Sequence, residues 1–195
     1  MGIFLSMSGF ALAASISPGP VNLVALSSSI QHGFKVSMRH VTGATVGFTV
    51  LLFLTGLGVH ELLTATPLLI SIVRWGGVAF LLFMAYKLAI DSGQLQTVEA
   101  SNKPSFLSGA AMQWLNPKAW LASLAGMGAF AGNGGSDLVW QFTAIYFVIC
   151  YASLSCWSTA GVFLRRYVDN PKRIRLFNRV IAAMLVVSTI YLIQE

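Results

Sequence analysis

Residues 14–23 read Ala-Ser-Ile-Ser-Pro-Gly-Pro-Val-Asn-Leu, which places Pro18 and Pro20 inside an apolar run that extends over about residues 3–30. A run of this length can cross a bilayer, because a spanning helix needs roughly 20 apolar residues. Proline has no backbone N–H and clashes with the carbonyl four residues back, so a helix kinks or opens at it. In lipid, the freed carbonyls must find partners or line a wet cavity. The stretch therefore predicts a membrane helix that is broken near its middle.

A second break follows in the other half of the chain. Residues 113–118 read Gln-Trp-Leu-Asn-Pro-Lys, inside an apolar run over residues 106–130. Pro117 lies 99 positions after Pro18, close to half the length of a chain of 195 residues. A single such proline is explained by a simple kink. Two breaks at equivalent positions favour a secondary transporter, in which interrupted helices of two inverted halves form the substrate site near the bilayer midplane.

Composition places nearly the whole chain in lipid. Hydrophobic residues make up 56% of the sequence and charged residues only 9%, whereas about a quarter of the residues of a soluble domain are charged. The runs are continuously apolar, unlike the alternating pattern of membrane strands. We therefore predict an all-α, polytopic membrane protein with a single domain over residues 1–195 and pseudo-repeats at about 1–97 and 98–195. The six predicted spans cover about residues 3–30, 40–60, 68–88, 106–130, 138–163 and 180–193.

The charge pattern predicts an orientation. The net charge is +6, but the basic residues fall between apolar runs, which is the positive-inside pattern and not a nucleic-acid surface. The basic loops should face the cytoplasm, and in a six-span protein both termini then face the periplasm. Ten of the twelve basic residues lie on that one side, namely Lys35, Arg39, Lys87, Lys103, Arg165, Arg166, Lys172, Arg173, Arg175 and Arg179.

Polar residues beside the two breaks are the candidate site. A lysine near the bilayer centre costs roughly 2.5–3.5 kcal/mol on insertion scales, so Lys118 needs a reason to be there. It either holds a substrate carboxylate or pairs with backbone carbonyls for structure alone. Asn22, Gln113 and Asn116 either bind an amino group or satisfy the opened backbone. The helix segments that restart after each break present free N–H groups and a positive dipole end, which attract an anion.

Other features indicate neither an enzyme nor a metal site. No catalytic constellation is present, and the sequence predicts no cofactor and no bound metal. No Asp or Glu stands in the middle of a span, which leaves the energy source of transport open. Gly43 and Gly47 form a small-xxx-small pair that predicts close helix packing. Such small-residue faces permit a homo-oligomer without demonstrating one.

These residues resemble the LysE/RhtB family of bacterial amino-acid exporters. The resemblance covers the first proline motif, its continuation through His32-Gly33-Phe34 to Gly43 and Gly47, and the second motif from residue 106 to Lys118. It implies export of amino acids across the bacterial inner membrane, with the proline motifs important for transport. Many members have an acidic residue just after the position of Gly47, where this chain has Phe48. This departure favours a neutral substrate. The sequence around residues 33–48 is similar to that of the cysteine/O-acetylserine exporter branch.

The sequence thus predicts an exporter of small neutral amino acids or derivatives, such as cysteine, O-acetylserine, homoserine or threonine, that works by alternating access. The alternatives are a channel or carrier for another small solute, and a membrane scaffold with no transport role. The amino acid and the lipid bilayer are the expected partners. The predicted substrate-binding residues are Pro18, Gly19, Pro20, Asn22, Gln113, Asn116, Pro117 and Lys118.

Overall fold

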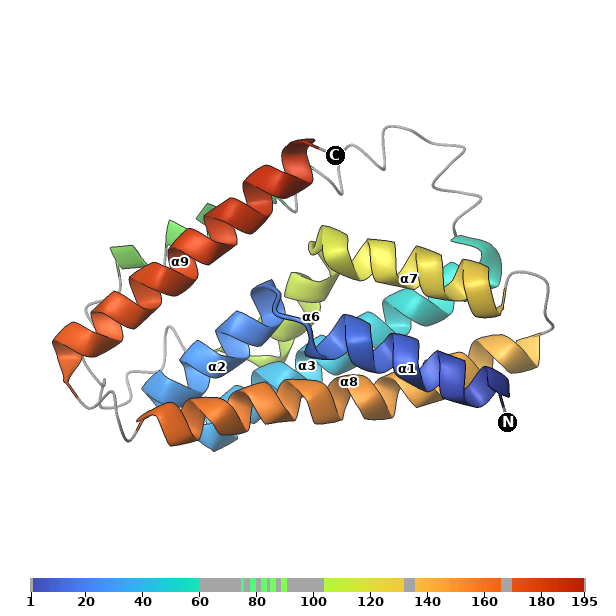
Figure 1. Cartoon of the computed structure of the whole chain (residues 1–195), viewed down its shortest axis with the longest axis horizontal. Helices are drawn as coiled ribbons and strands as arrows, with labels where there is room; N and C mark the ends of the chain where they lie inside the picture. The colour runs from blue at the N-terminus through green and yellow to red at the C-terminus, as the bar shows by residue number, and fades with distance from the viewer. Residues whose placement is uncertain are drawn as a thin grey trace.

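The computed structural model describes residues 2–59, 104–131, 136–165 and 170–194, together with separate positions between 75 and 90. Within these residues every regular element is a helix, so the predicted all-α class is confirmed. The span predicted over residues 68–88 lies almost entirely outside them. The described helices, shown in Figure 1, are α1 (Gly2–Ile16), α2 (Pro20–His32), α3 (Phe34–Leu54), the π-helical turn η1 (Thr55–Val59), α6 (Phe106–Trp114), α7 (Pro117–Phe130), α8 (Ser136–Arg165) and α9 (Pro171–Gln194).

Three of these segments meet the length and composition of a membrane span. The helix from Phe34 to Gly58 has 25 residues and α8 has 30 residues, and both are apolar enough to cross a bilayer. The pair α1 and α2 qualifies as one span that is bent by 58° at its break. The chain is therefore an all-α polytopic membrane protein. The broken first helix is confirmed, and so is the broken fourth, because α6 ends at Trp114 and α7 restarts at Pro117.

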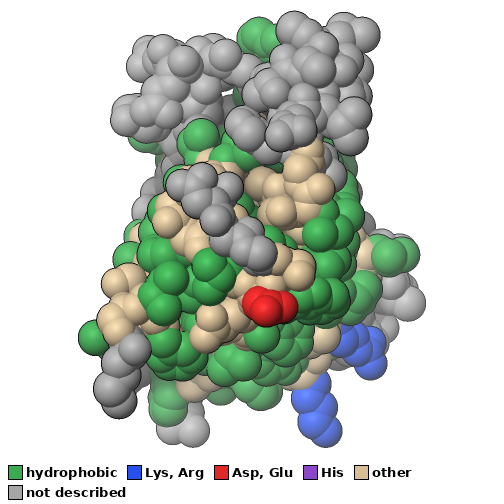
Figure 2. Space-filling model, turned by 90° about the vertical axis from the view of Figure 1, so that its right-hand side faces the viewer, with side chains coloured by type: hydrophobic (Ala, Val, Ile, Leu, Met, Phe, Trp, Pro, Cys, Tyr) green, Lys and Arg blue, Asp and Glu red, His purple; other side chains and the backbone are tan. Residues whose placement is uncertain are grey.

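The outer surface is that of a protein surrounded by lipid. Large apolar side chains point outward along the helices, with Leu5, Leu107 and Val148 exposed by 74%, 76% and 65%. Figure 2 shows one end of the molecule, the right-hand end in Figure 1, where hydrophobic side chains also dominate and charged side chains are few. Because lipid tails are as apolar as leucine, this exposure carries no penalty in a bilayer.

Helices α1 and α7 lie side by side and run in opposite directions. Near the breaks, the Lys118 ammonium of α7 contacts the carbonyl of Ser17 just beyond α1, at 2.9 Å. Towards the other ends of the two helices, the rings of Phe10 and Phe130 lie 5.8 Å apart between centroids. Figure 1 shows the same relation between the whole pairs, since α1 and α2 run against α6 and α7. This direction is the one expected of two halves with inverted topology.

Glycines bring α3 and α6 into direct backbone contact. A Cβ on Gly47 would lie 2.7 Å from the Cα of Ala110, and a Cβ on Gly43 would overlap the backbone of Phe106. On the other side, Gly109 faces the backbone of His40 and Ala44. The predicted packing role of Gly43 and Gly47 is confirmed. This contact fixes α6, and with it the second break, against α3.

Two helix starts differ from the prediction. Helix α3 begins at Phe34 and not near residue 40, because Gly33 has a φ of 83° and turns the chain from α2 directly into α3. Helix α9 begins at Pro171 and not near residue 180. The basic residues from Lys172 to Arg179 therefore lie on helical turns, where we had predicted a loop. In both cases polar first turns extend the helix beyond its apolar part, which hydropathy alone does not detect.

Candidate functional site

The two helix breaks meet in space through Lys118. Its Nζ donates to the carbonyl of Ser17 at 2.9 Å, to the Ser17 hydroxyl at 2.8 Å and, over 3.4 Å, to the carbonyl of Pro18. These carbonyls belong to the first break. They follow the C-terminus of α1, which is the negative end of the helix dipole. A half-buried cation is therefore held at a place where the backbone is electron-rich. The structural pairing considered for Lys118 from the sequence is thus present, and it joins the two halves of the chain.

Side chains also satisfy the other carbonyls that the first break frees. The Ser17 hydroxyl donates to Ala14 O at 3.1 Å, and the Asn22 amide donates to Ser15 O at 2.8 Å. The indole of Trp157 on α8 donates to Ile16 O at 3.0 Å. Together with Lys118, these donors satisfy every carbonyl from Ala14 to Pro18. The requirement that freed carbonyls find partners in lipid is met within the protein.

The helices that restart at the breaks have different N-termini. Helix α2 starts with Pro20 at its first turn after Gly19, and no side chain caps it. Helix α7 starts with Pro117, and the Asn116 side chain accepts from the Lys118 backbone N–H at 3.1 Å. Asn116 is therefore a helix cap. The free end that suits an anion is that of α2, which lies next to Lys118.

The tripeptide Asn-Pro-Lys occurs twice among the described residues and caps a helix in the same way both times. Asn170-Pro171-Lys172 opens α9, and there the Asn170 side chain accepts from the Lys172 backbone N–H at 2.9 Å. Asparagine before a first-turn proline starts both helices in the same way. The local conformation of Asn116, Pro117 and Lys118 thus follows from helix capping. Lys118 differs from the exposed Lys172 because its ammonium group lies at the first break.

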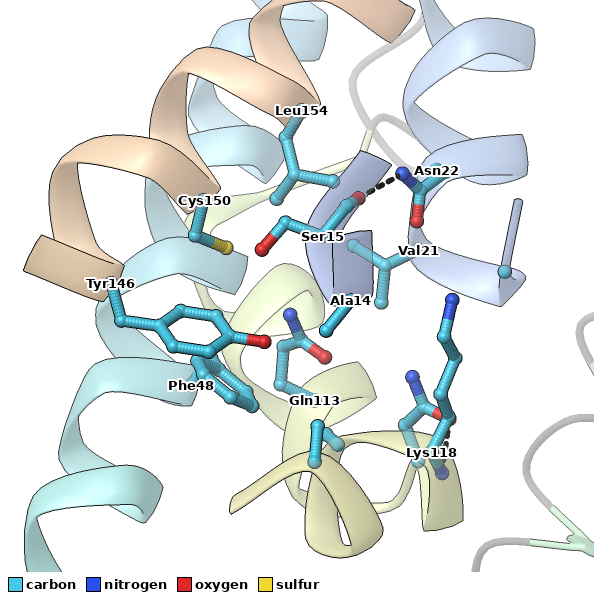
Figure 3. A pocket seen from close by; sticks show the side chains of 14 residues that line it. Ala14, Ser15, Val21, Asn22, Phe48, Gln113, Lys118, Tyr146, Cys150 and Leu154 are labelled. Atoms are coloured by element: carbon cyan, nitrogen blue, oxygen red, sulfur yellow. Dashed lines mark hydrogen bonds between the residues drawn. The ribbon is translucent and has the colours of Figure 1, made fainter. Parts of the chain in front are cut away.

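A small cavity lies beside the breaks, with a volume of about 40 Å³, which is room for a few water molecules. Figure 3 shows Lys118 at one side of this space and Tyr146 and Cys150 at the other, with Gln113 and Ser15 between them. Five of the residues predicted from the sequence contribute to its wall, while Pro18, Pro20 and Pro117 shape the breaks without lining it. The lining residues are Ala14, Ser15, Gly19, Val21, Asn22, Phe48, Gln113, Asn116, Lys118, Ala119, Ala122, Tyr146, Cys150 and Leu154.

Several wall residues were not among the predicted site residues. Tyr146 and Cys150 come from α8, and both side chains are almost fully buried. The ring of Tyr146 lies against Phe48, with centroids 4.5 Å apart, and against Phe142, with centroids 5.6 Å apart. The sequence singles out Phe48 only as a departure from the family pattern. Because Phe48 lines the cavity, this departure changes the lining itself. Ser15 stands three residues before Pro18, at the end of α1.

Among the described residues, the wall carries one cation and no carboxylate. Lys118 is the charged side chain in the lining, and Asp137 is the one acidic residue that the structure describes. Asp137 lies in the first turn of α8, more than two turns before Tyr146. The two tryptophans that flank the second break do not line the cavity, since the indole of Trp120 instead donates to Trp114 O at 2.7 Å. The cavity is thus electropositive, with amide and hydroxyl groups around it.

A family model described as LysE type translocator matches residues 12–195. The chain belongs to the LysE type translocator family. Among similar proteins, the cysteine/O-acetylserine efflux proteins of Escherichia coli (strain K12) and Shigella sonnei (strain Ss046) are each 28% identical to it over 180 residues, which is 91% of this chain and 90% of theirs. The corresponding protein of Escherichia coli O6:K15:H31 is 27% identical over the same length. No solved structure matches the chain.

Membership of the LysE type family makes this chain a membrane transporter, and the names of its relatives describe efflux and not catalysis. Amino-acid export is the class of activity that these comparisons support. The two proline motifs quoted from the sequence lie within the matched residues, and these are the segments that meet at Lys118.

Proposed function

We propose that the protein exports small neutral amino acids or their derivatives, such as cysteine, O-acetylserine, homoserine or threonine, across the bacterial inner membrane by alternating access. The observation that carries the proposal is the meeting of two broken helices at a cavity whose described lining holds one cation and no carboxylate. An electropositive cavity between discontinuous helices suits a substrate with a carboxylate group.

The carboxylate would bind between Lys118 and the start of α2. A Cβ placed on Gly19 would lie 3.2 Å from Lys118 Nζ, so the uncapped N-terminus of α2 and the ammonium group are neighbours. Free helical N–H groups and a lysine are the donors that a carboxylate uses. The carboxylate would replace part of the hydrogen bonding that Lys118 makes to Ser17 and Pro18.

The amino group of the substrate needs acceptors, and the wall offers amide oxygens. Asn22 uses its amide nitrogen on Ser15 O, which leaves its oxygen for another partner. Gln113 is buried and also lines the cavity. We assign the amino end of the substrate to the oxygens of Asn22 and Gln113, whereas Asn116 contributes mainly by capping α7.

Phe48 supports a neutral side chain on the substrate. It is buried in the wall against Tyr146, at the position where the sequence departs from members with an acidic residue. A cationic side chain such as that of lysine would lie against an aromatic ring and find no carboxylate in the lining. The relatives named as cysteine/O-acetylserine efflux proteins agree with a neutral substrate.

The test is efflux from cells loaded with amino acids by dipeptide feeding, in which every released amino acid and O-acetylserine is quantified. Cells with the protein should release one or a few neutral compounds faster than cells without it. Lys118→Ala should reduce this release at least about tenfold, since hydrogen bonds to charged groups contribute about 1.5–3 kcal/mol. Lys172→Ala is the matched control, because Lys172 has the same place after Asn-Pro but is exposed. It should export normally.

A second measurement separates the carboxylate role of Lys118 from its structural role. Cysteinamide has the amino group and thiol of cysteine but no carboxylate, so it should not compete with cysteine for the intact protein. If it competes as well as cysteine does, Lys118 serves structure alone. If no amino acid is released while the protein is present in the inner membrane, the export proposal itself is wrong.

A further inference from the structure

The end of the cavity away from Lys118 is a second polar group of side chains. Figure 3 shows the Ser15 hydroxyl, the Tyr146 hydroxyl and the Cys150 thiol pointing into the same space. They come from two helices, α1 and α8, and all three residues are at most 8% exposed. Phe48 and Phe142 hold the Tyr146 ring from two sides, so its hydroxyl has a fixed position.

Ser15 differs from the hydroxyl residues that bond back to their own helix. Helical serines and threonines commonly bond the carbonyl four residues back. Ser15 does not; its buried hydroxyl makes no close hydrogen bond to the backbone and instead faces the Tyr146 hydroxyl and the Cys150 thiol. It lines the cavity instead. The residues that do bond back are Ser6, Thr42, Thr49, Thr55, Ser155 and Thr159.

Burial alone does not single out Ser15. Among the described residues, four further hydroxyls are also buried and make no close hydrogen bond, those of Ser28, Thr45, Thr143 and Ser153, but none of these residues lines the cavity. A buried polar group without a partner costs about 1–3 kcal/mol. A ligand in the cavity can offer a hydrogen bond to Ser15 and not to the other four.

We propose that Ser15 and Tyr146 form the subsite for the substrate side chain and select a small, uncharged side chain that can form hydrogen bonds, such as a hydroxyl, a thiol or an ester. This inference rests on the proposed export of amino acids and adds the group that discriminates between them. With Lys118 at the opposite side, the carboxylate and the side chain of one small molecule bind at the two ends of the cavity. A site that hydrogen-bonds a substrate group rejects analogues that lack it, because its own polar atoms then stay unpaired.

The experiment uses the full chain in liposomes and measures counterflow exchange, which needs no imposed ion gradient. Three pairs of substrates differ by one group of similar size: cysteine and 2-aminobutyrate, threonine and valine, homoserine and norvaline. For the pair that is transported best, the intact protein should prefer the polar member at least about tenfold. Ser15→Ala should reduce this preference about threefold to tenfold, which is the range for one hydrogen bond of 0.5–1.5 kcal/mol.

Two further variants decide between the outcomes. Tyr146→Phe keeps the ring against Phe48 and should also reduce the preference. Ser153→Ala removes a buried hydroxyl from α8 outside the cavity and should leave the preference unchanged. If Ser15→Ala and Tyr146→Phe both keep the full preference, or slow both members of the pair equally, the subsite is refuted while export stands. If the intact protein exchanges no amino acid at all, the proposed function fails first.

Discussion

At the scale of single residues, the first break is a set of backbone carbonyls that side chains satisfy one by one. Ser17 and Asn22 are local donors, whereas Trp157 and Lys118 come from other helices. Trp157 and Lys118 therefore stabilise both the break and the packing of α8 and α7 against it. Removing any of them leaves a carbonyl in a place where water is scarce.

Asn116 and Asn170 allow a matched pair of variants. Asn116→Ala and Asn170→Ala each remove a helix cap, and each should cost about 0.5–2 kcal/mol of stability. Thermal unfolding in detergent should thus show similar losses for both variants. Transport should fall only for Asn116→Ala, because only Asn116 lines the cavity. Equal transport by the two variants would limit Asn116 to a capping role.

Gly19 should tolerate little added volume. Gly19→Ala places a methyl group 3.2 Å from Lys118 Nζ and 3.4 Å from its Cδ, so the lysine must shift away from the start of α2. We expect export to fall several-fold with little change in unfolding temperature, since the lysine side chain can adjust. Gly128→Ala on α7 is the control, because nothing lies within 4 Å of its added methyl group. Normal export by Gly19→Ala would argue against a carboxylate site beside this glycine.

At the scale of helices, the contact between α3 and α6 holds the second break in place. Gly43→Ala would push a methyl group into the backbone of Phe106, and overpacking of this kind costs about 1–3 kcal/mol. We expect a lower unfolding temperature and less protein in the membrane. Gly9→Ala on α1 has open space around it and should behave like the unchanged protein. An unaltered unfolding temperature for Gly43→Ala would show that the two helices can separate at no cost.

Proline and glycine made both breaks predictable, because their effect on a helix is local. The residues 106–130 predicted for the fourth span match α6 and α7 at both ends. The partners across the break were not predictable. Helix α8 is apolar on the faces towards lipid and towards the core, so its sequence does not reveal that Tyr146 and Cys150 face the cavity while Phe147 and Val148 are exposed. In a soluble helix the polar face would have given this direction.

At the scale of the whole molecule, the opposite directions of α1 and α7 are those expected of inverted halves, while the two repeats and the orientation in the bilayer stay predictions. Two exposed residues offer a direct test, since Ser136 begins α8 and Asn170 caps α9, five residues after the last residue of α8. A cysteine at residue 170 should react with a membrane-impermeant maleimide only from the cytoplasmic side. A cysteine at residue 136 should react only from the periplasm. The reverse pattern would invert the whole topology.

The ammonium group of Lys118 has three N–H donors, and here they are directed to Ser17 and Pro18. A carboxylate that binds Lys118 must take one or more of these donors, and the carbonyl that loses its donor then has to find another partner. The substrate carboxylate and the backbone carbonyls thus compete for the same N–H donors at the break between α1 and α2. Substrate binding in such a carrier must weaken the hydrogen bonds between Lys118 and this break. Recognition of the substrate and the first movement of α1 and α2 would then be the same event.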